Sequence, residues 1–203
     1  ILSDAGEQGG TAKGHYFYQD LWAARRIYQK RPEHHLDVGS RMDGFVAHLL
    51  VFMDVTVMDI RPIKSKILGL TFKQADLMSK QSLIASEAES VSCLHALEHF
   101  GLGRYGDPLD FDGWKKGLIN LAQMVKPGGR LYLSVPIGRQ TIEFNAHRIF
   151  APSTISVFMT QLCFEMLEFS YLDDDGNFHE AVQIPERCDC AYGCGCFIFR
   201  RLL

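Results

Sequence analysis

The sequence predicts an α/β fold, in which a mostly parallel β-sheet carries helices on both faces. Through the first two thirds of the chain, apolar stretches alternate with segments of helical periodicity. Each expected strand is apolar throughout, as strands of a parallel sheet covered on both faces are. In the last third, two apolar stretches and a turn cluster from Asp173 to Asn177 predict an antiparallel hairpin at the sheet edge.

The expected helices follow from apolar residues at three- and four-residue spacing. They span residues 16–30, 45–52, 81–87, 111–125 and 152–162. Pro32 ends the first, and Ser153 is the expected N-cap of the last. The apolar face of the first helix is expected to consist of Tyr18, Leu21, Trp22, Ala24, Arg25 and Tyr28. That of helix 111–125 is expected to consist of Trp114, Leu118, Leu121, Ala122 and Val125.

The expected strands are short runs of apolar and β-branched residues. They lie at residues 35–38, 55–58, 68–75, 90–94, 130–135, 164–172 and 194–200. A glycine loop at residues 39–44 follows the first strand. The segment Lys126-Pro127-Gly128-Gly129 predicts a sharp turn immediately before the fifth.

Length and composition limit the class of protein. With 203 residues, 47% of them hydrophobic, one soluble domain is expected: residues 1–14 as a flexible arm and residues 15–203 as the domain. A net charge of -3 argues against nucleic-acid binding, which usually needs a basic face. No apolar run approaches the roughly 20 residues that span a bilayer, and the first 14 residues do not read as a signal peptide. A cytoplasmic location is therefore expected.

The six cysteines do not suggest a disulfide scaffold in a chain of this length. Cys93 and Cys163 lie in apolar stretches and are expected in the core. Zinc sites favour pairs with two to four residues between the cysteines, whereas single-residue spacing places both thiols on one face of a strand. No metal is therefore expected, and zinc remains the alternative, at the four C-terminal cysteines, Cys188, Cys190, Cys194 and Cys196.

The segment from His35 to Pro62 carries the strongest functional pattern. It runs from a buried strand through a tight glycine loop and a helix to a second strand that ends in an acid. Asp59 follows Asp37 by 22 residues, close to the ~20-residue offset at which an acid meets a ribose in nucleotide-binding units. The segment therefore predicts a cleft for a nucleoside cofactor.

Several motifs together resemble those of class I S-adenosylmethionine-dependent methyltransferases over roughly residues 16–200. The residues that carry the resemblance, in order, are Asp37-Val38-Gly39, Asp59, Asp76-Leu77, Leu97-Glu98-His99 and Lys126-Pro127-Gly128-Gly129-Arg130. More narrowly, D-V-G-S-R-x-D-G-F, H-A-L-E-H-F-G-L-G-R-Y-G-D-P and F-N-A-H-R are similar to an uncharacterised methyltransferase-like domain family first described from nematode sequences. The resemblance implies a Rossmann-like methyltransferase fold with a mostly parallel seven-stranded sheet and a C-terminal antiparallel hairpin.

The same resemblance implies S-adenosylmethionine as cofactor. Asp37 is expected to order the loop and to attract the ammonium of the methionine moiety, Asp59 to accept from both ribose hydroxyls, and Asp76 to accept from the adenine amino group. The cofactor-binding residues expected from the motif are Asp37, Gly39, Ser40, Arg41, Asp59, Ile60, Asp76 and Leu77.

The glycine loop departs from the family pattern, because Arg41 and Asp43 stand where further glycines are usual. An arginine does not adopt positive φ as readily as glycine, and Gly44 is a candidate for the displaced flexible point. One hypothesis is that Arg41 pairs with the cofactor carboxylate, which suits a guanidinium. The alternative is a solvated arginine on a remodelled loop that has lost the cofactor.

Three histidines are candidate catalytic residues. His95 is expected at the carboxyl end of the fourth strand, where open α/β sheets place their chemistry, and a neutral imidazole there can take a proton from an acceptor hydroxyl. His99 belongs to the following motif, and His147 is expected to face the acceptor across the cleft. Packing or hydrogen bonding is the alternative role of His95. The H-x-x-E-H spacing of residues 95–99 also matches an inverted zinc protease motif, which requires a helix that is not expected here.

The acceptor is expected to be a small molecule, such as a sugar or glycan precursor, methylated on oxygen or nitrogen. Residues 101–112 are expected to form a lid or acceptor loop. The expected acceptor-binding residues are Arg104, Tyr105, Glu143, Asn145 and Arg148, with an ordinary surface role as the alternative for the last three.

Two other functions fit the fold. A non-catalytic binding or scaffold protein would use the same cleft without the cofactor. A dinucleotide- or nucleotide-sugar-binding protein would share the ribose acid, but the chain lacks the G-x-G-x-x-G spacing. The oligomeric state does not follow from the sequence.

Overall fold

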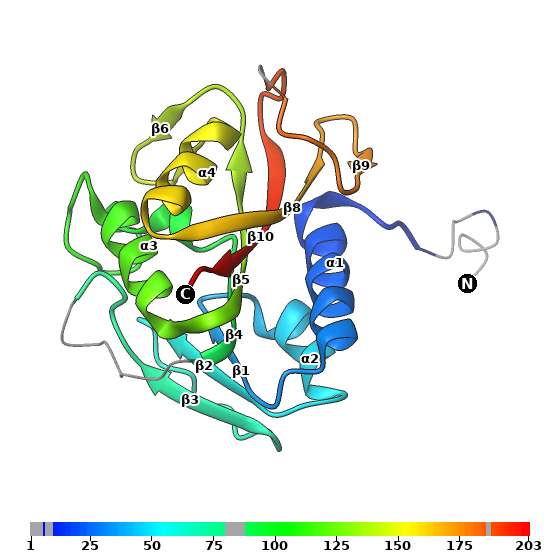
Figure 1. The fold of residues 1–203 in the computed structure, drawn as a ribbon, viewed down its shortest axis with the longest axis vertical. Helices are drawn as coiled ribbons and strands as arrows, with labels where there is room; N and C mark the ends of the chain where they lie inside the picture. Colours follow the sequence, from blue (N-terminus) through cyan, green and yellow to red (C-terminus); the bar gives the residue numbers. More distant parts are fainter. Residues whose placement is uncertain (1–5, 7–9, 80–87, 186–187) are drawn as a thin grey trace.

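The computed structural model describes residue 6 and residues 10–79, 88–185 and 188–203. In this part of the chain the main sheet has eight strands in the order β3-β2-β1-β4-β5-β10-β8-β9 (Figure 1). The first five pair in parallel, and β10 is antiparallel to both β5 and β8. The strands are β1 (His35–Val38), β2 (Val55–Asp59), β3 (Leu70–Gln74), β4 (Ala88–Leu94), β5 (Val125–Ile137), β8 (Phe164–Leu172), β9 (Phe178–His179) and β10 (Gly193–Arg201).

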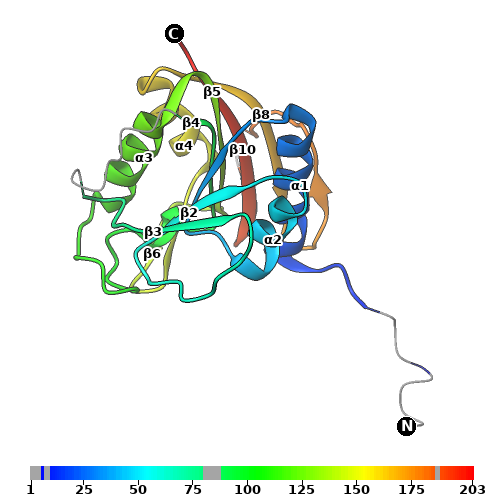
Figure 2. The same ribbon diagram turned by 90° about the horizontal axis from the view of Figure 1, so that it is seen from below.

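Helices cover both faces of this sheet, as expected from the uniformly apolar strands. On one face lie α1 (Gly14–Lys30) and α2 (Ala47–Leu50), preceded by a π-helical turn (Met42–Val46). On the other face lie α3 (Gly113–Met124) and α4 (Pro152–Gln161) (Figure 2). A single 3₁₀ turn (Leu97–His99) follows β4, and a small hairpin of β6 (Thr141–Glu143) and β7 (His147–Ile149) follows β5.

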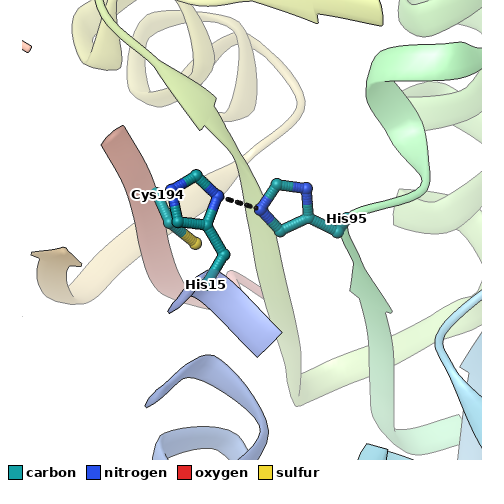
Figure 3. Close-up of side chains that lie close together, drawn as sticks. All are labelled: His15, His95 and Cys194. Atoms are coloured by element: carbon teal, nitrogen blue, oxygen red, sulfur yellow. Dashed lines mark hydrogen bonds between the residues drawn. The ribbon is translucent and has the colours of Figure 1, made fainter. Parts of the chain in front are cut away.

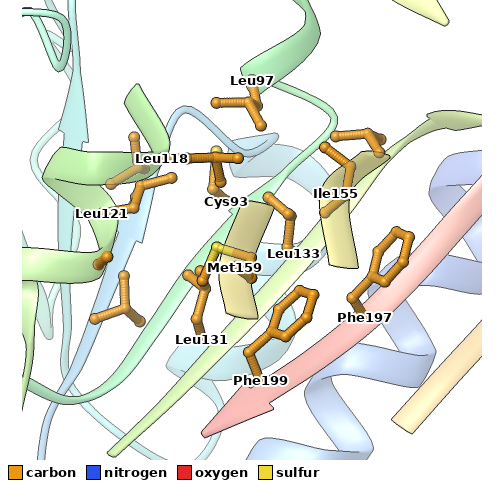
Figure 4. Packing of buried hydrophobic residues seen from close by; sticks show 14 of the residues in the cluster. Cys93, Leu97, Leu118, Leu121, Leu131, Leu133, Ile155, Met159, Phe197 and Phe199 are labelled. Carbon is orange, nitrogen blue, oxygen red and sulfur yellow. The ribbon is translucent and has the colours of Figure 1, made fainter. Parts of the chain in front are cut away.

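The sheet separates two hydrophobic layers, and β10 shows how one strand serves both. Every second side chain of β10 belongs to the layer under α1. These side chains are Cys194, Cys196 and Ile198, and they share that layer with Trp22 and Ile27 of α1. Phe197 and Phe199 of β10 point to the opposite face of the sheet. There they join the layer that includes Leu118 and Leu121 of α3 and Ile155 and Met159 of α4 (Figure 4). Burial of a side chain of this size contributes about 1.5–3 kcal/mol. The core therefore fixes the central strands, whose carboxyl ends build the site.

The buried face of α1 differs from the expected one. Arg25 and Tyr28 are exposed, whereas Gln19 and Asp20 are buried. Gln19 accepts a hydrogen bond from Ser134 of β5, and its amide donates to Asp20. Buried polar side chains are stable when they have such partners, and apolar periodicity alone does not reveal them.

The glycine-rich turn at residues 126–129 lies inside β5 rather than before it. The pairing with β4 passes from Ala88–Val125 directly to Ser90–Arg130, so four residues of β5 stand opposite the single residue Glu89. Gly128 there has a φ of 77°, which favours glycine. The segment is a long bulge in β5, and regular parallel pairing with β4 resumes at Arg130.

Three smaller expectations were wrong, and one lies outside the described residues. Ser153 does not cap α4, which begins with Ala151 as N-cap and Pro152 at its first position, a place that suits proline. Cys163 is exposed in a left-handed turn between α4 and β8. The turn at Asp173 joins β8 to the two-residue β9, although β8 and β10 do pair as expected. The helix expected at 81–87 falls on residues that are not described.

The packing of helix α3 confirms its expected face. Trp114, Leu118, Leu121 and Ala122 are buried, and Cys93 is buried beside them as expected. Val125, the fifth residue of the expected face, is buried too, but it begins β5 because α3 ends at Met124. No helix in the described residues is long and apolar enough to cross a membrane. That residues 15–203 form a single domain stays a prediction.

Candidate functional site

A cavity opens at the carboxyl ends of β1, β2 and β4. Open parallel sheets bind ligands at this edge. The cavity brings together residues that the sequence places far apart. Those expected as site residues that line it are Gly39, Asp59, Ile60, Asp76, Leu77, His95, His99 and Tyr105.

Asp37 lies below the cavity and is fully buried. Its carboxylate accepts hydrogen bonds from the backbone N–H and hydroxyl of Ser40 and from the hydroxyl of Ser92. Ser40 in turn accepts from the backbone N–H of Leu94, which ties the loop to β4. Burial raises the pKa of Asp37 to about 6, although these hydrogen bonds oppose the shift. Asp37 therefore orders the loop, as expected; direct attraction of a ligand ammonium stays a prediction.

The loop after β1 keeps its shape despite Arg41 and Asp43. Only Gly39 needs left-handed backbone, with a φ of 70°, and a Cβ there would lie 2.9 Å from the Cβ of Ala96. Arg41 has an ordinary φ of -69°, so it needs no glycine-like freedom. Gly44 is needed for a different reason, since a Cβ there would lie 2.2 Å from Oδ2 of Asp20 in α1. Gly44, which was expected to be the flexible position of the loop, is instead a position of close packing against α1.

The side chain of Arg41 is paired within its own loop. Its Nε and Nη2 donate to the two oxygens of Asp43 at 3.0 and 2.7 Å, and its guanidinium lies 4.7 Å from the ring centre of Tyr16. Arg41 lines a shallow surface hollow beside the cavity, together with Gly39, Ser40 and Asp59. A ligand carboxylate would have to compete with Asp43 for this arginine.

Asp59 ends β2 and faces the cavity with its side chain 9% exposed. Arg61 binds both of its oxygens, through Nε at 3.0 Å and Nη2 at 2.7 Å, and adds its backbone N–H at 2.8 Å. The guanidinium of Arg61 also lies 4.4 Å from the ring centre of Tyr105. Asp76 caps the turn after β3 by accepting from the N–H of Met78.

His95 follows β4 with a φ of 51°, an uncommon conformation for a residue other than glycine. Its Nδ1 lies 2.7 Å from Oε1 of Glu98, and its Nε2 lies 3.0 Å from Nδ1 of His15 in α1. Glu98 is buried, which by itself would raise its pKa, but the charge and hydrogen bond of His95 lower it overall. Burial, with the charge of His95, lowers the pKa of His15 to about 4.

His99 faces the same buried carboxylate from the other side. Its Nδ1 donates to the carbonyl of Ala146 at 2.7 Å, and its Nε2 lies 3.7 Å from Oε1 of Glu98. Burial lowers the pKa of His99, which favours the neutral imidazole, although the charge of Glu98 opposes the shift. Arg104 donates to the same carbonyl of Ala146. The two residues together hold the turn of the β6–β7 hairpin beside the cavity.

The remaining expected acceptor residues lie outside the cavity lining. His147 packs against the ring of Tyr192, with centroids 4.9 Å apart, and its Nε2 lies 3.4 Å from Glu143. Glu143 and Asn145 are exposed on the hairpin. Arg148 is buried, and its guanidinium donates to the carbonyls of Glu98, Phe100, Asp110 and Phe111. Arg148 thus clamps the ends of the expected lid, and binding of an acceptor by these residues stays a prediction.

Sequence reasoning missed three residues that shape the site. Arg61 stands two residues beyond the acid that was expected to bind the ribose, and that spacing was a usable signal. His15 and Tyr192 gave no usable signal, because they come from α1 and from the segment before β10. The alternative zinc site grouped Cys194 with the other C-terminal cysteines, whereas the fold places it beside His15 and His95. The H-x-x-E-H motif forms a single 3₁₀ turn, with His95 ahead of it, and not the helix that a zinc protease needs.

Solved structures with the same architecture define the class of fold. The 1,6-didemethyltoxoflavin-N1-methyltransferase of Burkholderia thailandensis, solved with its substrate and S-adenosylhomocysteine, is 14% identical with a TM-score of 0.64 over 91% of this chain and 79% of that one. The N-methyltransferase NodS of Bradyrhizobium japonicum is 15% identical, with a TM-score of 0.63, and the match covers 93% of this chain and 97% of NodS. The cyclase SpnF is 13% identical, with a TM-score of 0.67, and the match covers 98% of this chain and 86% of SpnF. The chain therefore has the class I S-adenosylmethionine-dependent methyltransferase fold.

The sequence also places the chain in a particular family. The model of the family described as Caenorhabditis protein of unknown function, DUF268, matches residues 46–184. The chain belongs to this family, as the narrower motif resemblance predicted. No protein with a curated description matches the chain.

Proposed function

We propose that this protein binds S-adenosylmethionine in the cavity at the ends of β1, β2 and β4 and transfers its methyl group to oxygen or nitrogen of a small molecule. The arrangement that carries the proposal is the meeting of the Gly39 turn, Asp59 and Asp76 around one cavity. Gly39 permits close backbone approach, Asp59 suits two ribose hydroxyls, and Asp76 with Leu77 suits an adenine edge. Solved proteins of this fold with bound S-adenosylhomocysteine support it.

The chemistry needs alignment more than it needs catalytic groups. Bound S-adenosylmethionine supplies an electrophilic methyl group, and the attacking oxygen or nitrogen loses a proton. Holding the two reactants in line supplies most of the acceleration in such a displacement. We assign proton removal to His95, positioned by Glu98, with His99 and His147 as further candidate bases.

The acceptor proposed for the site is a hydroxylated small molecule such as a sugar or a glycan precursor. Polar side chains at the β6–β7 hairpin and the lid supply donors and acceptors for hydroxyl groups; they are Arg104, Tyr105, Glu143 and Asn145. This part of the proposal rests on the chemistry of these side chains. Incorporation of labelled methyl from S-adenosylmethionine into a panel of free sugars and nucleotide sugars tests it, and labelling confined to other acceptors would contradict it.

Ligand-dependent stability tests the cofactor proposal. We expect S-adenosylmethionine and S-adenosylhomocysteine to raise the Tm and NAD to leave it unchanged, since a ligand at 100 times its Kd stabilises by about 2.7 kcal/mol. Asp59→Asn should abolish the shift, whereas Asp175→Asn, an exposed acid on the turn after β8, should keep it. Arg41→Ala should weaken binding of S-adenosylmethionine if Arg41 leaves Asp43 for the methionine carboxylate.

One observation favours the alternative of a non-catalytic binding or scaffold protein on this fold. Asp59 and Arg41, two of the polar groups offered to the cofactor, are both paired with side chains of the chain itself. The cyclase among the solved structures also shows that this fold does not fix the reaction. Absence of any Tm shift with the three ligands would favour the scaffold and contradict the cofactor proposal.

A further inference from the structure

Three side chains from distant segments direct metal-binding atoms at one point beside the cavity (Figure 3). His15 comes from the first turn of α1, His95 from the end of β4 and Cys194 from β10. Nδ1 of His15 and Nε2 of His95 are 3.0 Å apart, and one ring nitrogen of each histidine lies within 4.8 Å of Sγ of Cys194. His95 and Cys194 are buried, and His15 is partly buried.

These separations are close to those of a tetrahedral metal site. With metal–nitrogen bonds of about 2.0–2.1 Å and metal–sulfur bonds of about 2.3 Å, the donor atoms of such a site are roughly 3.3–3.6 Å apart. The two nitrogens need to separate by a few tenths of an ångström, and the sulfur of Cys194 needs to approach them by up to roughly 1.3 Å. Imidazole and thiolate together suit Zn²⁺ and similar divalent metals.

Both histidines have second partners of the kind that orient metal ligands. Nδ1 of His95 faces the buried carboxylate of Glu98 at 2.7 Å, which leaves Nε2 for the shared point. His15 has a hydrogen bond with the backbone of Tyr192 in addition to its contact with His95. A metal-bound histidine usually donates its other N–H to a carboxylate or a carbonyl in this way.

The charges around the shared point also favour a cation. Oε2 of Glu98 is buried and has no hydrogen-bond partner among the described residues. Metal binding converts the thiol of Cys194 to a thiolate and releases one proton to solvent. The two positive charges of the metal then balance the thiolate and the Glu98 carboxylate. A buried carboxylate is costly unless it is paired, and the pairing of Glu98 with His95 and His99 involves only Oε1.

We propose that His15, His95 and Cys194 form a His₂Cys site for Zn²⁺ or a similar divalent metal, with a fourth position open to water or a ligand. The site would fasten the start of α1 to the carboxyl end of β4 and to β10. A metal on Nε2 of His95 takes up the nitrogen that the proposed base would use, so metal binding and proton removal by His95 exclude each other. Metal binding itself does not require that the protein be a methyltransferase.

Cobalt substitution tests the site directly, because a cobalt–thiolate bond gives a charge-transfer band in the near ultraviolet. The full chain, purified without a metal-affinity tag and treated with chelator, is titrated with Co²⁺ and then with Zn²⁺. We expect one Co²⁺ per chain with the spectrum of a tetrahedral site and one thiolate, and displacement by one Zn²⁺. Absence of stoichiometric binding would overturn the proposal.

Matched variants locate the metal. Cys194→Ser should remove the charge-transfer band, and His15→Gln should weaken Zn²⁺ binding at least tenfold, while far-ultraviolet circular dichroism shows that both variants fold. Cys196 is the matched control, because its Sγ lies 3.9 Å from that of Cys194. The variant Cys196→Ser should keep the band. A band that survives Cys194→Ser and disappears in Cys188→Ser or Cys190→Ser would place the metal at the other cysteines and contradict the proposal.

Discussion

Arg61 holds both carboxylate oxygens of Asp59 in a two-pronged pair, with Nε–Oδ1 and Nη2–Oδ2 distances of 3.0 and 2.7 Å. The acid that is proposed to bind a ribose is therefore already satisfied by a residue two positions away. The side chain of Arg61 is 50% exposed, so water can replace Asp59 as its partner. Exposed pairs contribute about 0.2–1 kcal/mol, and the burial of Asp59, which is 9% exposed, puts this pair at the upper end of that range. The pair is weak enough for a ligand to open.

Removal of Arg61 should therefore strengthen cofactor binding. Arg61→Ala frees Asp59, and we expect the Kd for S-adenosylhomocysteine to fall about 1.5- to 5-fold, equivalent to the ~0.2–1 kcal/mol of the pair. Isothermal titration calorimetry of wild type and variant measures the difference. Arg139→Ala, which removes an exposed arginine after β5, is the control and should change nothing. Weaker binding in Arg61→Ala would mean that the arginine contacts the ligand.

A methyl group at Gly44 should destabilise the fold. The added Cβ would lie 2.2 Å from Oδ2 of Asp20, whose other oxygen is held by Gln19. Crowding of this kind costs about 1–3 kcal/mol, so Gly44→Ala should lower the free energy of unfolding by that amount in urea denaturation. At Gly6 a Cβ would meet nothing within 4 Å, and Gly6→Ala should leave stability unchanged. Equal stability of both variants would contradict the close packing of the loop against α1.

His35 should make the protein sensitive to mild acid. It is fully buried between Ser90 and Ser92, and because the hydroxyl proton of Ser92 goes to Asp37, Nε2 of His35 donates to Ser92 and Nδ1 accepts from Ser90. Burial lowers its pKa from the ordinary value of 6.5 to about 3. Its contribution to stability is thus present above pH 6.5 and is lost as the pH falls toward 3, because only the unfolded chain takes up the proton.

The pH dependence of unfolding in a variant isolates this contribution. Between pH 4 and 6 the free energy of unfolding of wild type should fall more steeply than that of His35→Asn, by about 1.4 kcal/mol per pH unit. Asp20 and Asp37, whose pKa values burial raises to about 6, act in the opposite direction in both proteins and cancel in the comparison. His48→Asn, at an exposed position, should follow wild type. Parallel curves for all three proteins would rule out the buried neutral histidine.

Arg148 should hold the lid in place. Its guanidinium donates to the carbonyls of Phe100 and Phe111, at the two ends of the expected acceptor loop. A lysine lacks the forked donors and keeps at most part of these contacts, so Arg148→Lys should lower stability by about 1–3 kcal/mol. It should also raise amide hydrogen exchange in residues 101–112. Arg139→Lys is the matched control, and exchange that stays at the wild-type level in Arg148→Lys would show that the clamp is dispensable.

The sequence alone determined the order of the main strands and helices and where the candidate cofactor residues stand along the chain. The strand at His35–Val38 was predicted with its exact bounds, since Pro32 ends the helix before it and the loop that begins at Gly39 follows it. The positions of Asp59 and Asp76 follow from chain order, since the carboxyl ends of parallel strands share one edge of the sheet. Local pattern and topology are sufficient for such assignments.

Only the tertiary structure decided what those side chains touch. The pairing of Asp59 with Arg61 depends on rotamers, and the shared point of His15, His95 and Cys194 depends on three segments folding together. The buried polar face of α1 was also invisible to periodicity, because Gln19 and Asp20 are stabilised by partners on other elements. Sequence patterns record burial and local geometry, whereas hydrogen-bond and metal-ligand sets arise between residues that only packing brings together.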